Sequence, residues 1–319
     1  MKKKVVVMGG GNGSAITTNA LKKFVDEIEL SSVISMSDSG GSSGKLRKEF
    51  DTVPPGDILR AVLSMSKYDY KFLRQIFNKN RIKSDGNLDN HSLGNILLVL
   101  MEKYSSDYMQ SIMALEDAVE AVGHVYPVTL DQTDLVVELD NGDVVKTEGL
   151  IDRPDYDRNL KIQNAWLEPD VKIFKEAKEK IEEADYILMG PGSLYCSVVA
   201  TLLPKGVFEA IKKSTAKLIY VCGNAYEEMG ETGPKRLSEF INQLENYLPR
   251  KLDKIIFNHA KLDDKQLRHY KEKKWNLIEF DEENLKDHDV AVGDFEKETG
   301  GLDPVKLGDL LKQLSCKQK

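Results

Sequence analysis

Residues 37–44 have the composition of a phosphate-binding loop. They read Ser-Asp-Ser-Gly-Gly-Ser-Ser-Gly and directly follow residues 30–36, a mainly apolar run that predicts a buried strand. Glycines permit positive φ angles and close approach of a ligand to backbone N–H groups, which can bind an anion. Lys45 and Arg47 add positive charge, and Asp38 can hold a hydroxyl group or a metal ion. The expected ligand of this loop is a phosphate or a pyrophosphate.

Two further glycine-rich turns follow predicted strands. The apolar residues 5–8 lead into Gly-Gly-Gly-Asn-Gly-Ser at 9–14, and residues 186–189 lead into Gly-Pro-Gly-Ser at 190–193. A helical pattern follows each turn. Because ligands of an open parallel sheet bind at the carboxyl ends of its strands, three such turns favour one nucleotide-sized site.

The first turn is not a standard dinucleotide fingerprint. Reading it from Gly9 requires a third glycine where Ser14 stands, and reading it from Gly11 requires one where Ile16 stands. No Walker A pattern with its lysine and hydroxyl residue occurs there. Plain turn chemistry is the alternative interpretation of residues 9–13.

Polar residues near two predicted helix starts are further candidates. Asp57 precedes a predicted helix at 58–66 and either caps it or faces Asp38 across the pocket. His91 and Asn95 lie four residues apart near the start of an apolar helix and therefore share one face. With Ser92 beside them, they favour a first turn that faces the ligand. Position alone does not decide whether His91 holds a phosphate, holds a base or is structural.

The composition fits a cytoplasmic protein with a sizeable core. The chain has 319 residues, 41% of them hydrophobic, and a net charge of −7, which argues against a general nucleic-acid surface. The apolar run after Lys2, Lys3 and Lys4 ends at Gly9, too early for a signal peptide, and no segment is long enough to insert in a membrane. The three cysteines are widely spaced, which fits neither a disulfide framework nor a zinc site.

Alternating strand and helix patterns predict an α/β fold. We expect one Rossmann-like domain over residues 1–319, with a mostly parallel sheet and helices on both faces. A β-rich insertion or small lobe is expected at 125–168, because strand patterns at 134–139 and 144–147 flank Asn141-Gly142, a hairpin signal. Later strands are expected at 217–222, 254–258 and 275–280. Asn224 follows the first of these and should lie at the edge of the sheet that faces the ligand.

Five motifs occur in the order typical of one family. They are Gly-Gly-Gly-Asn-Gly at 9–13, Asp-Ser-Gly-Gly-Ser-Ser-Gly-Lys-Leu-Arg at 38–47, Pro-Pro-Gly-Asp at 54–57, His-Ser-Leu-Gly-Asn at 91–95 and Gly-Pro-Gly-Ser-Leu-Tyr at 190–195. The chain thereby resembles, over nearly its whole length, the gluconeogenesis factor (YvcK-like) family within the wider 2-phospho-L-lactate transferase (CofD-like) superfamily.

The resemblance implies a cytoplasmic protein that binds a nucleotide sugar such as UDP-N-acetylglucosamine or UDP-glucose. It also implies a link to growth on gluconeogenic carbon sources and to cell shape. The transferase branch moves a phospholactyl or phosphoenolpyruvyl group from a guanosine diphosphate carrier to a deazaflavin, with magnesium. Both branches would place a nucleotide diphosphate over the glycine loops.

Three positions depart from the family pattern. Ser39 stands where a second aspartate is common, which leaves Asp38 alone as a weak magnesium ligand. Asn12 stands where threonine is common, and Gly301 stands where an arginine is frequent. Tyr270 does match a tyrosine associated with nucleotide-sugar binding.

Our leading interpretation is a regulatory protein that binds a UDP-sugar, with NAD(P) or a GDP-type nucleotide as other ligands to test. The alternative is a magnesium-dependent transferase with Asp38, Asp57 and His91 as catalytic candidates. The sequence leaves open the oligomeric state, including a homo-oligomer, and any protein partner. The expected nucleotide-binding residues are Gly10, Gly11, Asn12, Gly13, Asp38, Ser39, Gly40, Gly41, Ser42, Ser43, Gly44, Arg47, His91, Ser92, Asn95, Gly190, Pro191, Gly192, Ser193, Asn224 and Tyr270.

Overall fold

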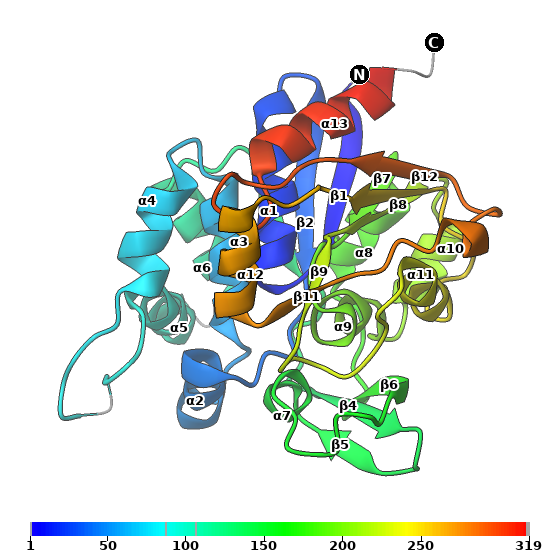
Figure 1. The fold of residues 1–319 in the computed structure, drawn as a ribbon. Coiled ribbons are helices and arrows are strands. Elements are labelled where there is room, and N and C mark those ends of the chain that lie inside the picture. The colour runs from blue at the N-terminus through cyan, green and yellow to red at the C-terminus, as the bar shows by residue number, and fades with distance from the viewer. Residues whose placement is uncertain (1, 87, 106, 317–319) are drawn as a thin grey trace.

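A parallel sheet of seven strands forms the centre of the molecule (Figure 1). The computed structural model describes residues 2–86, 88–105 and 107–316. The strand order is β3-β2-β1-β7-β8-β10-β12, and every pairing within it is parallel. The strands are β1 (Lys3–Gly9), β2 (Ile28–Ile34), β3 (His124–Pro127), β7 (Tyr186–Met189), β8 (Lys217–Cys222), β10 (Lys254–Asn258) and β12 (Val290–Gly293).

The central strands are buried on both faces. Val7 of β1 lies opposite Ser32 of β2 and Leu188 of β7 in the register of the sheet. The successive residues Val6, Val7 and Met8 of β1 are all buried, although successive side chains of a strand point to opposite faces. This burial explains why these strands read as continuous rather than alternating apolar runs.

The strand order reverses between β1 and β7. From β1 the chain proceeds toward β2 and β3, whereas from β7 it proceeds toward β8, β10 and β12. Right-handed crossovers therefore place α1 (Gly11–Leu21) and α10 (Val207–Lys213) on opposite faces of the sheet. This arrangement confirms the predicted α/β fold, and it opens a crevice at the carboxyl ends of β1 and β7.

The remaining helices cover these two faces and the ends of the sheet. On one face α1 packs against α3 (Pro55–Met65) and α13 (Pro304–Cys316), and on the other α10 packs against α8 (Lys175–Glu182). In the described parts of the chain, no helix combines the length and apolar character needed to cross a bilayer. The other helices are α2 (Gly41–Phe50), α4 (Tyr70–Arg74), α5 (Leu93–Ser105), α6 (Tyr108–Ala118), α7 (Glu148–Asp152), α9 (Ala200–Leu202), α11 (Leu237–Glu245) and α12 (Asp264–Lys273), with 3₁₀ turns at Lys22–Phe24 and Glu282–Asn284 and π-helical turns at Gln75–Lys79 and Leu194–Val199.

A small antiparallel sheet projects from one end of the main sheet (Figure 1). It contains β4 (Asp134–Leu139), β5 (Val144–Lys146) and β6 (Ile162–Glu168), and the hairpin between β4 and β5 turns at Gly142 with a φ of +86°. The first residues of the expected insertion at 125–168 belong instead to β3, which pairs with β2. We call residues 134–168 the β lobe.

The strand expected at 275–280 is shorter and lies elsewhere. β11 (Trp275–Leu277) pairs antiparallel with β9 (Ala225–Glu227), outside the main sheet. The last strand of the main sheet is β12, which the sequence did not predict. It lies at the edge of the sheet, where none of its four residues is buried, and its apolar run Val-Ala-Val is too short to give a clear strand signal.

Candidate functional site

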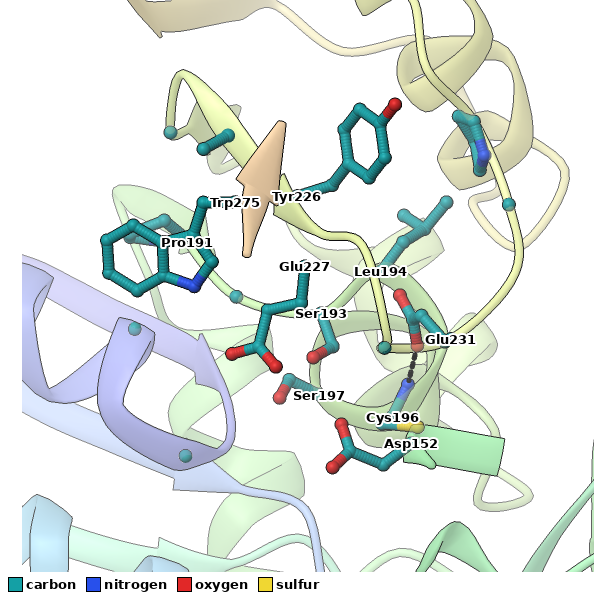
Figure 2. A pocket seen from close by; sticks show the side chains of 18 of the residues that line it. Asp152, Pro191, Ser193, Leu194, Cys196, Ser197, Tyr226, Glu227, Glu231 and Trp275 are labelled. Atoms are coloured by element: carbon teal, nitrogen blue, oxygen red, sulfur yellow. Dashed lines mark hydrogen bonds between the residues drawn. The ribbon is translucent and has the colours of Figure 1, made fainter. Parts of the chain in front are cut away.

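A large cavity lies at the carboxyl ends of β1, β7 and β8. Its volume is about 1080 Å³, and its walls come from the first and third glycine turns, the β lobe and the β9–β11 ribbon (Figure 2). Nine of the expected binding residues line it, as does Asp57: Gly11, Asn12, Gly13, Asp38, Pro191, Gly192, Ser193, Asn224 and Tyr270. The cavity therefore occupies the position at which open parallel sheets bind ligands.

The first and third glycine turns are in direct contact. A Cβ atom on Gly13 would lie 1.9 Å from the carbonyl oxygen of Pro191, closer than any side chain allows. The Thr17 hydroxyl of α1 donates a hydrogen bond to the Gly190 carbonyl oxygen at 2.8 Å. Gly10 and Gly190 lie beside the cavity lining rather than in it. The two turns thus form one continuous wall.

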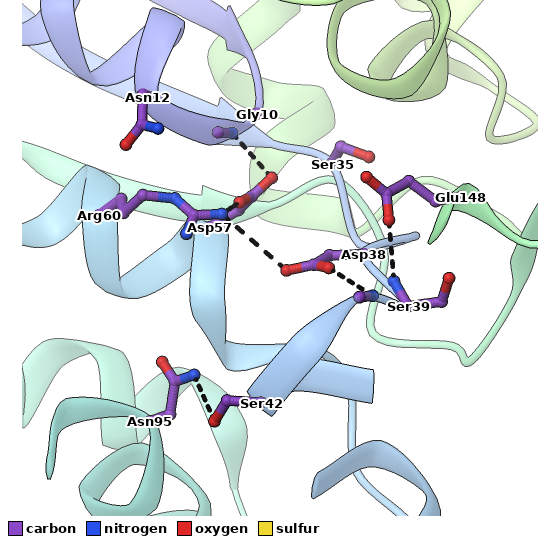
Figure 3. Close-up of polar contacts among 12 residues, drawn as sticks. Gly10, Asn12, Ser35, Asp38, Ser39, Ser42, Asp57, Arg60, Asn95 and Glu148 are labelled. Carbon is purple, nitrogen blue, oxygen red and sulfur yellow. Dashed lines mark hydrogen bonds and ion pairs between the residues drawn. The ribbon is translucent and has the colours of Figure 1, made fainter. Parts of the chain in front are cut away.

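Of the second glycine loop, only Asp38 reaches the cavity. A Cβ on Gly44 would lie 1.9 Å from the Ser39 carbonyl oxygen, so the loop folds back on itself. The Ser42 hydroxyl lies 2.8 Å from His91 Nδ1. It also accepts a hydrogen bond from Asn95 Nδ2 at 3.1 Å (Figure 3). The remaining residues of this loop, Ser39, Gly40, Gly41, Ser42, Ser43 and Gly44, do not line the cavity, nor do His91, Ser92 and Asn95.

His91 and Arg47 have structural partners outside the cavity. Burial and the charge of Lys45 lower the pKa of His91, which favours the neutral ring beside Ser42. The Arg47 guanidinium donates to Asp134 Oδ1 at 3.1 Å and to the Thr133 carbonyl oxygen at 2.9 Å. These contacts join α2 to the β lobe. Sequence reasoning could not separate this role from phosphate binding, since both require a cation near the loop.

Asp57, Arg60 and Asp38 form a charged cluster on the cavity wall (Figure 3). Arg60 pairs with Asp57 and lies 3.9 Å from Asp38 Oδ2. Asp57 Oδ2 also accepts the Gly11 N–H at 2.8 Å, which links the cluster to the first turn. Burial and the charge of Asp57 raise the pKa of Asp38. Burial lowers the pKa of Arg60, but the two carboxylates outweigh this effect and raise it.

Three residues that the sequence did not single out meet near this cluster. The possible ligand atoms of Glu148, Asp152 and Cys196 lie within 4.8 Å of one another, close enough to share a metal ion. Two carboxylates and a thiol suit a transition metal better than magnesium, which prefers oxygen ligands. Glu148 Oε2 also accepts the Ser39 N–H at 3.3 Å. The i, i+4 spacing of Glu148 and Asp152 on α7 was the available signal, but spacing alone does not bring Cys196 to them.

Stability should fall with pH through Glu148. Burial and the charge of Asp38 raise the pKa of Glu148 from 4.5 to about 8. The folded protein therefore holds this proton over a range in which the unfolded chain has lost it. The stabilising contribution is complete below pH 4.5 and is lost as the pH rises to about 8. We expect the thermal midpoint of the wild type to drop more steeply across this range than that of Glu148→Gln. Parallel curves would contradict the shift.

Tyr270 and Asn224 form a buried hydrogen-bonded network in the wall of the cavity, beyond the end of β8. The Tyr270 hydroxyl lies 2.6 Å from Asn224 Oδ1 and 2.9 Å from Glu296 Oε1. Burial and the charge of Glu296 raise the pKa of Tyr270, so the phenol stays protonated. Glu296 also accepts the Gly301 N–H. Gly301 lines the cavity with a φ of +85°, a conformation that favours glycine over arginine.

An internal carboxylate already occupies the donors beside the third turn. Glu231 accepts the Tyr195 N–H at 3.1 Å and the Cys196 N–H at 2.9 Å (Figure 2). Burial raises the pKa of Glu231, although these hydrogen bonds oppose the rise. Residues 190–193 therefore contribute backbone shape to the cavity, while the N–H groups that follow them are satisfied by the protein itself.

The fold and the cavity define a Rossmann-like protein whose candidate ligand site lies where the strand order reverses. The chain belongs to the 2-phospho-L-lactate transferase CofD family, whose profile matches residues 5–295. The gluconeogenesis factor of Halalkalibacterium halodurans is 34% identical over 89% of this chain and 86% of its own length. The Bacillus subtilis gluconeogenesis factor is 30% identical over 89% of this chain and 88% of its own.

Relatives that cover nearly the whole chain agree with this assignment. A Thermotoga maritima relative in the same group is 35% identical over 98% of this chain and 99% of its own length. A crystal structure of a UPF0052 family protein from Bacillus halodurans has a TM-score of 0.88 and 31% identity, and covers 98% of this chain and 99% of its own. The chain is thus a gluconeogenesis factor-like member of the CofD family.

Proposed function

We propose that this chain binds a nucleotide sugar of the UDP-N-acetylglucosamine or UDP-glucose type and acts as a regulatory protein. The observation that carries the proposal is the meeting of two glycine turns on one wall of a cavity of about 1080 Å³. That volume is at the upper end of small-molecule sites and suits a ligand with a base, a diphosphate and a sugar. The relatives named gluconeogenesis factor support a role in growth on gluconeogenic carbon sources.

The diphosphate is assigned to the start of α1. The helix begins after Gly10, which has no side chain with which to cap it, and its first turn contains no acidic residue. A helix start attracts anions through its free N–H groups and its dipole. The Gly11 N–H is already bound to Asp57, and Asn12 Oδ1 accepts a hydrogen bond from Arg74 at 2.6 Å. The backbone N–H groups after Gly11 are therefore the ones proposed to bind the ligand. The opposite end of the cavity, near Asn224, is left for the rest of the nucleotide.

Calorimetric titration tests the proposal. We expect UDP-N-acetylglucosamine and UDP-glucose to bind more tightly than GDP, NAD or NADP at equal ionic strength, with and without magnesium. Failure of every nucleotide to bind would overturn the proposal. A preference for GDP that depends on magnesium would favour the transferase branch instead.

The second candidate is a magnesium-dependent transferase, and the cluster of Asp38, Asp57 and Glu148 favours it. Three carboxylates at one cavity wall could assist a metal-bound diphosphate. If the regulatory proposal is correct, incubation with activated nucleotide donors, acceptor and magnesium yields no transfer product. Turnover that Asp38→Asn abolishes, while calorimetric binding persists, would establish the transferase.

A further inference from the structure

The β9–β11 ribbon brings an indole ring to the cavity. Trp275 is the first residue of β11 and lies directly opposite Glu227 of β9 in the antiparallel register. Directly opposed residues of such a pair project from the same face of the ribbon. Both residues line the cavity, where Figure 2 shows their side chains beside each other. Trp275 therefore offers a large aromatic surface to a ligand.

The protein supports this indole without stacking a ring on it. The Tyr270 ring meets it at 90° with centroids 5.3 Å apart, and the His269 ring meets it at 79° and 5.6 Å. Both contacts are edge-on, so no ring contact among the described residues lies parallel to the indole. A Cβ on Gly301 would lie 3.7 and 3.8 Å from two indole carbons. Any side chain at position 301 would thus start against the ring, and glycine leaves that flank open.

A buried amide without a full set of partners shares the neighbour Tyr270 with the indole. Asn224 is 4% exposed, lines the cavity and has its Oδ1 at the Tyr270 hydroxyl, while its Nδ2 has no partner among the described residues. Exchanging the positions of Oδ1 and Nδ2 by a flip of the amide would leave Oδ1, instead of Nδ2, without a hydrogen-bond partner. An unpaired buried polar group is costly, which indicates that a ligand completes the hydrogen bonding. Because Tyr270 touches both residues, the amide and the indole belong to one subsite.

We propose that Trp275 is the surface on which the nucleobase of the ligand stacks and that Asn224 hydrogen-bonds the edge of that base. This inference rests on the proposed function and adds the orientation of the nucleotide. Bases stack in parallel on aromatic side chains, and an amide supplies the donor or acceptor that a base edge needs. With the diphosphate at α1, after β1, the base reaches across the cavity to the ribbon that follows β8.

The intrinsic fluorescence of the protein tests the stacking directly. The chain has two tryptophans, and Trp166 of β6 lies outside the cavity lining. The Trp166→Phe variant therefore reports on Trp275 alone. We expect UDP to quench its emission in a saturable way, and inorganic pyrophosphate or free N-acetylglucosamine to leave the emission unchanged. Quenching by the free sugar but not by UDP would reverse the proposed orientation and overturn the inference.

Calorimetry with UDP separates this inference from the proposed function. Trp275→Ala should weaken binding on the order of 10- to 100-fold, because one base–aromatic stack is lost, whereas Trp275→Phe should retain most of the affinity. Trp166→Phe is the matched control and should bind as the wild type does. If UDP binds the wild type while Trp275→Ala binds equally well and Trp275 emission does not respond, the inference fails and the proposed function stands. If no nucleotide binds the wild type, both fail.

Discussion

Gly13→Ala is expected to destabilise the protein and abolish measurable nucleotide binding. The new methyl carbon would fall 1.9 Å from the Pro191 carbonyl oxygen and 2.9 Å from the Gly192 Cα, so backbone atoms would have to move. Overpacking of this kind costs about 1–3 kcal/mol or more of unfolding free energy. The displacement would also separate the two turns that form the proposed phosphate wall. Urea unfolding and calorimetry with a UDP-sugar measure the two effects.

Gly86→Ala is the matched control for this substitution. Among the described residues other than its chain neighbours, none has an atom within 4 Å of the position that a Cβ on Gly86 would take, and the φ of Gly86 lies outside the left-handed range. Its replacement should change the unfolding free energy by no more than about 0.5 kcal/mol. If Gly13→Ala proved as stable as Gly86→Ala and still bound nucleotide, the tight contact between the turns would not matter for the site.

Arg60→Met should destabilise the folded protein by about 3 kcal/mol, the lower end of the range for a buried ion pair, because it leaves Asp57 and the partly buried Asp38 without their cation. Methionine keeps much of the apolar volume, so the loss reports mainly on charge. Urea unfolding at neutral pH measures the effect. Arg60→Lys retains the charge and should recover a large part of it.

A second substitution tests the electrostatic cause. Adding Asp38→Asn to Arg60→Met removes one of the two carboxylates that have lost their cation, and it should restore part of the lost stability. Equal stabilities of the single and double variants would indicate that Arg60 acts through packing rather than through charge. The cycle is informative because Arg60 contacts both carboxylates, so the two sites are coupled.

Local sequence patterns were sufficient to predict the α/β fold. The strands β1, β7, β8 and β10 contain continuous apolar runs because both faces of a parallel sheet are covered, and such runs can be recognised in the sequence alone. The edge strand β12 escaped prediction because its apolar run is short, and β11 was predicted at 275–280, three residues too long. The strand order could not be predicted from the sequence, because it depends on which strands pair with one another across long stretches of chain.

The glycine turns illustrate how far the site itself could be predicted. Small residues after apolar runs located the turns at 9–14 and 190–193, because backbone conformation is a local property of glycine. The local sequence does not determine which residues of the second loop face the cavity. Ser42 and Arg47 are engaged by His91 and Asp134, which lie far along the chain.

The sequence by itself determined the parallel α/β class, the positions of the glycine turns and the family resemblance, because apolar periodicity and turn chemistry are encoded in neighbouring residues. Only the tertiary structure decided that Arg60 joins two aspartates, that Glu231 fills the donors beside the third turn and that Trp275 faces the cavity. Each of these arrangements depends on the distance between residues on different elements. Those distances follow from the strand order and the helix packing, which local sequence patterns do not specify.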